Sequence, residues 1–207
     1  MDAGVKVILV RHCETDHNRV GRVQGQSDAP LNERGLAQAA CLAQSLAGQS
    51  IQALYSSPLR RAVQTAEPIA AALGIEVRQS LSLMEIDAGE MDGLTGAEMR
   101  ERFPAVMSAW LAGPDGSVRL PGGESLDAVQ ARAWSFVESL RDQDGVQTAV
   151  CVTHYFVLLA LIARAVRLPL SNISRLRQSL GSFSVVEFRN ERVQVSKLNE
   201  TCHLVDV

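Results

Sequence analysis

The segment VKVILVRHCETDHN, residues 5–18, decides the fold class of this chain. Its first six residues form a short apolar run rich in β-branched side chains, which is typical of a buried strand. A second apolar run, TAVCV at 148–152, also stops just before a histidine, His154. Such runs alternate with helical patterns over residues 32–46, 57–73, 125–141 and 156–166. The alternation predicts an α/β domain with a largely parallel sheet.

Size and composition narrow the classes of protein to consider. The chain has 207 residues, 46% hydrophobic and 21% charged, which is typical of one globular domain spanning 1–207. Its net charge of −3 lacks the basic excess of a nucleic-acid binder. No apolar run reaches the about 20 residues of a membrane span, and the run at 7–10 is too short for a signal peptide. We therefore expect no nucleic-acid partner, no membrane partner and a cytoplasmic location.

The four cysteines lie far apart, so no pair has the spacing of a zinc site. Cys41 falls in an alanine-rich helical pattern and Cys151 in an apolar strand, both ordinary core positions. The other two are Cys13 and Cys202. This usage predicts reduced thiols, as in the cytoplasm.

Polar clusters follow three of the predicted strands. Arg11-His12 and His154 come directly after two of them, and Arg60-Arg61 follows a third by a few residues. Because the carboxyl ends of parallel strands meet at one edge of a sheet, we expect these side chains to converge. The arginine fork suits phosphate oxygens. The sequence therefore predicts an anion-binding site at this edge.

The same residue types suggest phosphoryl chemistry. A neutral imidazole can attack phosphorus, cations can balance the charge on the phosphoryl oxygens, and a carboxylic acid must protonate the leaving oxygen. Carboxylates available for that step are Glu85, Asp87, Glu90 and Asp92. Taken singly, each of these residues is more often structural or solvated. The coincidence of three clusters favours an enzyme that acts on an anion.

The segment LVRHCETDHN, residues 9–18, resembles the R-H-G-E-T-x-x-N signature of the histidine phosphatase superfamily, the phosphoglycerate-mutase-like proteins. Further blocks are similar in order and spacing: SSPLRRAVQTA at 56–66, Glu85 with Gly89 and Gly93, PGGES at 121–125 and VTH at 152–154. The resemblance covers about residues 5–203. It implies a three-layer α/β/α fold with a mostly parallel central sheet and an antiparallel last strand.

The resemblance also implies roles for individual residues. His12 would be the nucleophile that becomes phosphorylated, and Glu85 would protonate the leaving alcohol and later act as base toward water. The residues implied to bind the phosphate or the substrate are Arg11, Asn18, Gln24, Gly25, Arg60 and His154. No metal and no other cofactor is implied.

Four positions bear on specificity. Cys13 stands where the family usually has Gly, and Tyr155 where many members have Gly. The tail around His203 is similar to the metal-independent phosphoserine phosphatases, which have a His where this chain has Ala88. The thiol of Cys13 would be either an oxidisable group beside the pocket or a packing substitution, and His203 either touches substrate or belongs to a structural tail.

Three functions remain open at this stage. The first is a phosphomonoesterase that hydrolyses a small phosphorylated metabolite, and the second is a phosphoglycerate mutase that uses the same site. The third is a protein that binds phospho-ligands without turnover. Substrate candidates are phosphoserine, a sugar phosphate, a phosphoglycerate derivative and α-ribazole phosphate. We also expect that a homodimer can form, because relatives often pair and the terminal strand 192–198 could be a sheet edge.

Overall fold

The computed structural model describes residues 4–112, 116–190, 192–205 and 207. Within these residues six strands form one sheet in the order β3-β2-β4-β1-β5-β6. In chain order the strands are β1 (Val5–Arg11), β2 (Ala53–Ser56), β3 (Val77–Gln79), β4 (Thr148–Thr153), β5 (Phe183–Arg189) and β6 (Arg192–Glu200). The pairs among β3, β2, β4 and β1 are parallel, whereas β5 is antiparallel to both β1 and β6. The predicted, largely parallel α/β sheet is confirmed.

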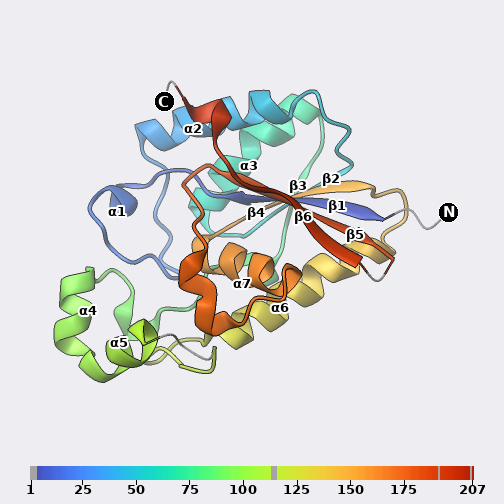
Figure 1. The fold of residues 1–207 in the computed structure, drawn as a ribbon. Helices are drawn as coiled ribbons and strands as arrows, with labels where there is room; N and C mark the ends of the chain where they lie inside the picture. Colours follow the sequence, from blue (N-terminus) through green and yellow to red (C-terminus); the bar gives the residue numbers. More distant parts are fainter. Residues whose placement is uncertain (1–3, 113–115, 191, 206) are drawn as a thin grey trace.

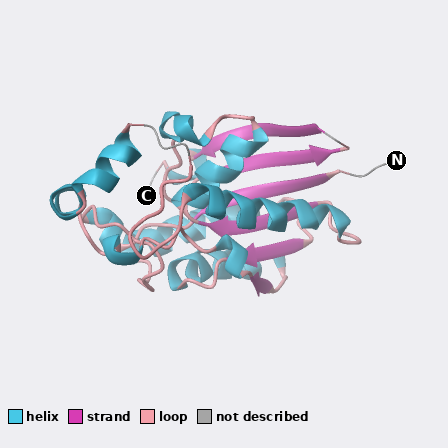
Figure 2. Cartoon of the chain, turned by 90° about the horizontal axis from the view of Figure 1, so that it is seen from below, coloured by secondary structure: helices cyan, strands magenta, loops and turns pink. Residues whose placement is uncertain are grey.

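Helices cover both faces of the sheet, as Figure 1 shows. Alternate residues of β1 point to opposite faces. Val7 and Leu9 belong to the core cluster that includes residues of α6 (Leu126–Ser139) and α7 (Tyr155–Ala165). Ile8 and Val10 belong to the cluster that includes α2 (Glu33–Leu46) and α3 (Arg60–Leu73). The three-layer arrangement is therefore fixed by strands that are apolar on both sides. Figure 2 shows the strands side by side from another direction.

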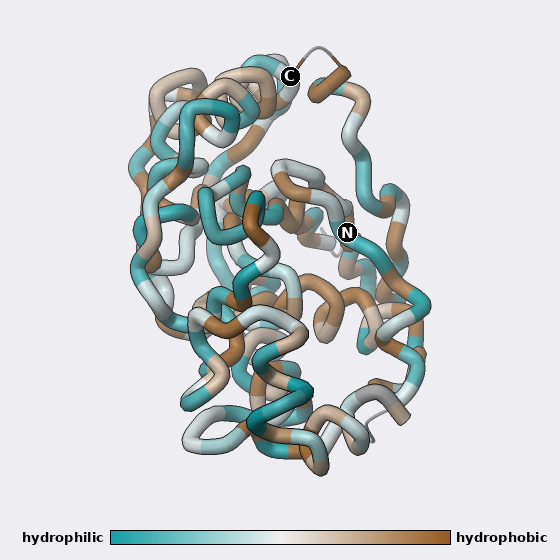
Figure 3. The backbone as a smooth tube through the Cα atoms, turned by 90° about the vertical axis from the view of Figure 1, so that its left-hand side faces the viewer, coloured by the Kyte–Doolittle hydropathy of each residue, from teal (hydrophilic) through white to brown (hydrophobic). Residues whose placement is uncertain are grey.

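The helices on one face show how local sequence sets their ends. Asn32 caps α2 as predicted, because its side-chain oxygen accepts a hydrogen bond of 2.8 Å from the Gly35 backbone N–H. α3 begins at Arg60, three residues after the predicted start at Ser57. It ends at Gly74, whose φ of +66° suits glycine. Hydrophobic and hydrophilic segments alternate along the helices near the top of Figure 3, as expected when one face of each is buried.

Short elements gather beyond the carboxyl ends of the parallel strands, at the left of Figure 1. They include α1 (Asp16–Arg19), within the predicted long loop, and the pair α4 (Gly96–Arg102) and α5 (Pro104–Leu111). Five 3₁₀ helices complete the described elements: η1 (Leu81–Leu83), η2 (Gly89–Met91), η3 (Leu140–Asp142), η4 (Leu170–Arg175) and η5 (Cys202–Leu204). Among the helices described, none has the length and apolar character needed to cross a membrane.

Candidate active site

Two histidines meet at the carboxyl edge of the sheet. The parallel pairing of β1 with β4 sets Arg11 opposite Thr153, so the next residue on each strand, His12 and His154, follows at the same edge. The backbone N–H of His12 donates to the Thr153 carbonyl at 2.9 Å. The two imidazole rings lie with their centroids 5.2 Å apart and their planes tilted by 53°. The convergence predicted from the sequence is therefore observed for these two residues.

The imidazole of His12 has one nitrogen held and one free. Its Nδ1 lies 2.7 Å from the carbonyl oxygen of Cys13, and because a carbonyl only accepts, Nδ1 must carry the proton. The lone pair of the neutral ring then lies on Nε2. Burial lowers the pKa of His12 well below 6.5, and the nearby charges of Arg61 and Arg11 lower it further. At neutral pH the ring is uncharged and has a fixed tautomer, the form in which an imidazole can act as a nucleophile.

Arg11 and Arg61 supply positive charge beside the histidines. Arg11 donates from Nη1 to the Gln178 carbonyl at 2.7 Å, and its guanidinium lies 4.7 Å from the centre of the Tyr155 ring. Burial lowers the pKa of Arg11 to about 10, so it stays charged at neutral pH. The Nη atoms of Arg61 donate to the Ser27 and Gly25 carbonyls, at 2.7 and 2.8 Å. Both side chains are thereby held in place.

Several buried polar atoms of this cluster have no hydrogen-bond partner among the described residues. They are Nε of Arg11, Nε of Arg61, both ring nitrogens of His154 and Oε1 of Gln24. Leaving such atoms unpaired is costly, so their presence together points to a ligand. Four of the five are nitrogens, and the guanidinium nitrogens only donate. An oxyanion with several acceptor oxygens fits this set.

Arg60, predicted to bind phosphate, does not reach the cluster. Its side chain is exposed, and its backbone N–H donates to Asp28 at 2.6 Å. The neighbouring Arg61 is fully buried and takes the expected place. Along α3, Arg61 lies on the row that continues through the buried Thr65 and Ile69, four residues apart each time. That helical row was the signal in the sequence that distinguishes the two arginines.

Glu85 is buried, with 4% of its surface exposed. Oε1 accepts from the Ile86 backbone N–H at 2.9 Å and Oε2 from that of Phe156 at 3.3 Å. Burial is the dominant influence and raises the pKa of Glu85, although these hydrogen bonds and the charges of Arg61 and Arg11 oppose it. A carboxyl group with a raised pKa is suited to donate a proton.

An ion pair holds the backbone on both sides of Glu85. The guanidinium of Arg132 binds both carboxylate oxygens of Glu124, at 3.0 and 2.9 Å, and also donates to the Glu85 carbonyl at 3.2 Å. Glu124 in turn accepts from the Asp87 backbone N–H at 2.9 Å. Arg132 was not among the residues predicted from the sequence. Its bidentate geometry fixes the loop from which the Glu85 side chain projects.

The three other residues predicted to bind ligand form a support around this cluster. The Asn18 side chain and Thr15 form a reciprocal cap at the start of α1. Gln24 donates to the Thr15 hydroxyl at 2.7 Å. Gly25 packs so closely that an added Cβ would lie 2.7 Å from the Cβ of Ala88, and its carbonyl receives Arg61. Among the hydrogen bonds of the described residues, none joins Asn18 to His12 or His154.

Cys13 of the signature and His203 of the tail both pack against neighbouring residues. Cys13 is fully buried in a small cluster with Leu31 and Ala39, and burial raises the pKa of its thiol to about 12. His203 hydrogen-bonds the Gly181 carbonyl at 3.0 Å and stacks on Phe183. Both arrangements favour the structural alternatives for these residues. Across the described parts of the chain, no group of three or more His, Cys, Asp or Glu side chains could hold a metal ion.

Residues 7–201 match the family model of the histidine phosphatase superfamily (branch 1). The chain belongs to this superfamily. It is 39% identical to phosphoserine phosphatase 1 of Hydrogenobacter thermophilus over 200 residues, which covers 97% of this chain and 94% of that protein. It is 34% identical to a probable phosphoglycerate mutase GpmB of Photorhabdus laumondii, over 90% of this chain and 86% of that one.

A solved structure agrees with the sequence relatives. Bacillus stearothermophilus YhfR superposes with a TM-score of 0.90 at 30% identity, covering 96% of this chain and 98% of that one. Membership of the histidine phosphatase superfamily, together with phosphatase relatives over nearly the whole chain, makes this protein a hydrolase of phosphoric monoesters. The resemblance inferred from the sequence blocks is confirmed.

Proposed function

We propose that the enzyme hydrolyses a small phosphorylated metabolite through a phosphohistidine on His12. In the first step Nε2 of His12 attacks phosphorus, the bond to the leaving oxygen breaks, and Glu85 gives that oxygen its proton. In the second step the Glu85 carboxylate takes a proton from water, and the water oxygen displaces Nε2 from phosphorus. Inorganic phosphate leaves, and both residues return to their starting forms.

The observation that carries this proposal is the fixed tautomer of His12. The 2.7 Å contact between Nδ1 and the Cys13 carbonyl leaves Nε2 unprotonated. The charges of Arg11 and Arg61 and the ring nitrogens of His154 are placed to balance the phosphoryl oxygens. Gln24 and Gly25 would border the substrate, while Asn18 would act by holding Thr15.

Trapping the intermediate tests the mechanism. The enzyme mixed with a radiolabelled phosphomonoester and quenched within a turnover should carry label that is stable in base and lost in acid. Peptide mapping should place that label on His12, and His12→Asn should carry none while keeping its fold. Label that resists acid, on a serine or threonine, would contradict the proposal.

Phosphoglycerate mutase activity is the alternative, favoured by the similarity to the probable mutase from Photorhabdus. A mutase returns the phosphoryl group to a second hydroxyl before water intervenes. Hydrolysis and the mutase reaction are distinguished by measuring phosphate release and 2-phosphoglycerate formation from 3-phosphoglycerate, with and without a bisphosphoglycerate primer. We expect phosphate release without dependence on the primer.

The proposal also covers the domain organisation, the cellular location and the oligomeric state. A single domain over 1–207 is supported by the one sheet that the described strands share. A cytoplasmic setting is supported by the free state of all four cysteines. A homodimer is supported only by the position of β6 at the edge of the sheet, and sedimentation of the purified chain tests it.

A further inference from the structure

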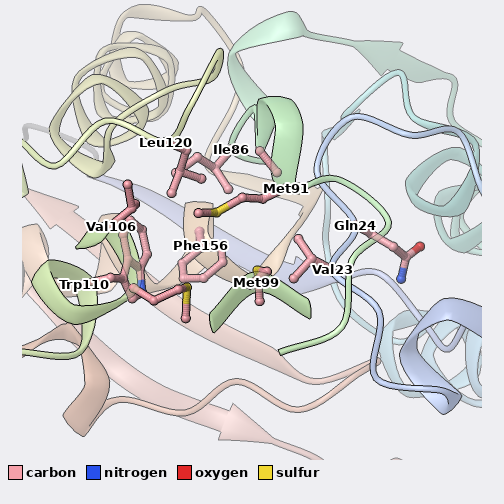
Figure 4. A pocket seen from close by; sticks show the side chains of 11 residues that line it. Val23, Gln24, Ile86, Met91, Met99, Val106, Trp110, Leu120 and Phe156 are labelled. Carbon is pink, nitrogen blue, oxygen red and sulfur yellow. The ribbon is translucent and has the colours of Figure 1, made fainter. Parts of the chain in front are cut away.

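A cavity beside Glu85 is lined almost entirely by apolar side chains. Figure 4 shows Val106 and Trp110 of α5 at the left, Met99 of α4 below and Ile86 above, with Phe156 near the centre. The Trp110 and Phe156 rings meet edge to face, with centroids 5.5 Å apart. Of the described residues that line the cavity, none is charged.

The cavity adjoins the proton donor. Two of its lining residues, Ile86 and Phe156, are also the residues whose backbone N–H groups bind the Glu85 carboxyl. A donor that protonates the leaving oxygen must lie within hydrogen-bond reach of it. From an oxygen bound to Glu85, the attached carbon atoms can extend past Ile86 and Phe156 into the cavity.

The polar lining is limited to Gln24, whose amide already donates to Thr15 and is turned away from the apolar side chains in Figure 4. Ala88 also lines this cavity and is buried. The metal-independent phosphoserine phosphatases resemble one another in having His at this position. A carboxylate or ammonium group placed here would lose its hydration without gaining a partner of opposite charge. An uncharged, apolar group would gain from burial.

We propose that this cavity receives the leaving group of the substrate, and that the enzyme prefers phosphomonoesters of uncharged alkyl or aromatic alcohols. The inference rests on the proposed function, because it needs Glu85 as proton donor. It sets this chain apart from a phosphoserine phosphatase, whose leaving group carries both a carboxylate and an ammonium. The free space of about 80 Å³ would hold roughly three groups the size of a water or a methylene, at about 30 Å³ each. A short alkyl chain, or part of an aromatic ring, matches that size.

A series of n-alkyl phosphates from ethyl to octyl tests the preference without any mutation. The leaving groups have nearly equal basicity, so differences in kcat/KM report contacts with the carbon chain. Each added CH₂ should raise kcat/KM about fourfold, the factor that corresponds to burying one methylene. The rise should stop once about three methylenes lie in the cavity, when it is full. Hexyl phosphate should exceed phosphoserine and 3-phosphoglycerate by at least about tenfold.

Two neighbouring residues of α5 give a matched pair of variants. Met107 lines the cavity, whereas Ser108 is exposed. Met107→Glu should lower kcat/KM for hexyl phosphate by about 10–200-fold and flatten the chain-length series, while Ser108→Glu should change neither. Met107→Ala, which adds no charge, should move the plateau to longer chains if Met107→Glu does not fold.

The outcomes separate this inference from the proposed function. A flat chain-length series, or phosphoserine preferred over hexyl phosphate, would overturn the apolar preference while leaving phosphatase activity and the phosphohistidine intact. Lack of turnover with every ester would overturn the proposed function and this inference with it. A rising series that is abolished in Met107→Glu but kept in Ser108→Glu would support the assignment.

Discussion

Adjacent arginines at the start of α3 give a direct test of how the site binds phosphate. Arg61 is fully buried and donates to the Ser27 and Gly25 carbonyls, whereas Arg60 is exposed. Arg61→Lys keeps the positive charge but loses the planar fork. Arg60→Lys makes the same chemical change one residue away, on the surface. The two variants therefore differ in position alone.

The expected loss follows from the contacts of Arg61. Two charged hydrogen bonds hold its guanidinium, and its Nε–H, which has no partner among the described residues, is a donor that the substrate can use. Removing one donor that stabilises developing charge typically costs about 10²–10³ in kcat. Leaving the buried Gly25 carbonyl without a donor costs about 1–3 kcal/mol, and the half-buried Ser27 carbonyl loses its donor as well. At about 2–4 °C per kcal/mol for a chain of this size, Arg61→Lys should also unfold at a lower temperature.

Phosphate release should be measured at a temperature where circular dichroism shows every variant folded. We expect kcat to fall about 10²–10³-fold in Arg61→Lys and less than threefold in Arg60→Lys, since a surface substitution away from special contacts changes little. Equal losses in the two variants, or a loss below about tenfold in Arg61→Lys, would refute the assignment of Arg61 to the phosphate site.

Four further predictions follow from the same geometry. Glu85→Gln should slow hydrolysis of alkyl phosphates by about 10²–10⁴-fold but nitrophenyl phosphate much less, because nitrophenolate leaves without a proton; equal losses would assign the proton to another acid. The pH profile of kcat/KM should be bell-shaped, because His12 must be neutral, above its lowered pKa, and Glu85 must be protonated, below its raised pKa. With nitrophenyl phosphate the alkaline limb should weaken. An alkaline limb that persists in Glu85→Gln would show that it does not come from Glu85. EDTA should leave activity unchanged, and inactivation reversed by a divalent metal would count against the proposed chemistry. Peroxide should inactivate the enzyme and Cys13→Gly at the same rate, because the buried thiol has its pKa raised to about 12 and little reactive thiolate; slower loss in the variant would restore a redox role for Cys13.

Residues that sit at strand ends were the predictable part of the site. The positions of His12 and His154 follow from two apolar runs that each stop at a histidine, because parallel pairing brings their ends together. The sequence pointed to the exposed Arg60 rather than the buried Arg61, because two arginines at a helix start differ only in which face of the helix they occupy. The predicted start of α3 was three residues early, and boundary errors of that size rotate the expected face.

Contacts between distant segments could not be predicted from the sequence. Arg132 of α6 binds Glu124, eight residues earlier in the chain. It also donates to the Glu85 carbonyl, which is 47 residues away. Nothing in the local pattern around Arg132 distinguishes it from a solvated helix residue, since its role depends on how α6 packs against the 85–92 loop. The apolar cavity has the same origin. Its lining comes from residues 23–24, the segment 86–91, Leu120, α4, α5 and α7, which only the folded chain assembles.

Burial prepares both reacting groups at once. Low polarity disfavours the charged form of any side chain, so it favours the neutral form of His12 and the protonated form of Glu85. These are the forms that a nucleophile and a proton donor need, and they arise from one cause acting on a base and an acid. The charges that remain are those of Arg11 and Arg61, a total of about two positive charges. A phosphomonoester dianion brings two negative charges, so its entry neutralises the site. The same dianion beside Glu85 would disfavour the carboxylate further and raise the pKa of Glu85 again, so substrate binding reinforces the protonated form that the first step consumes.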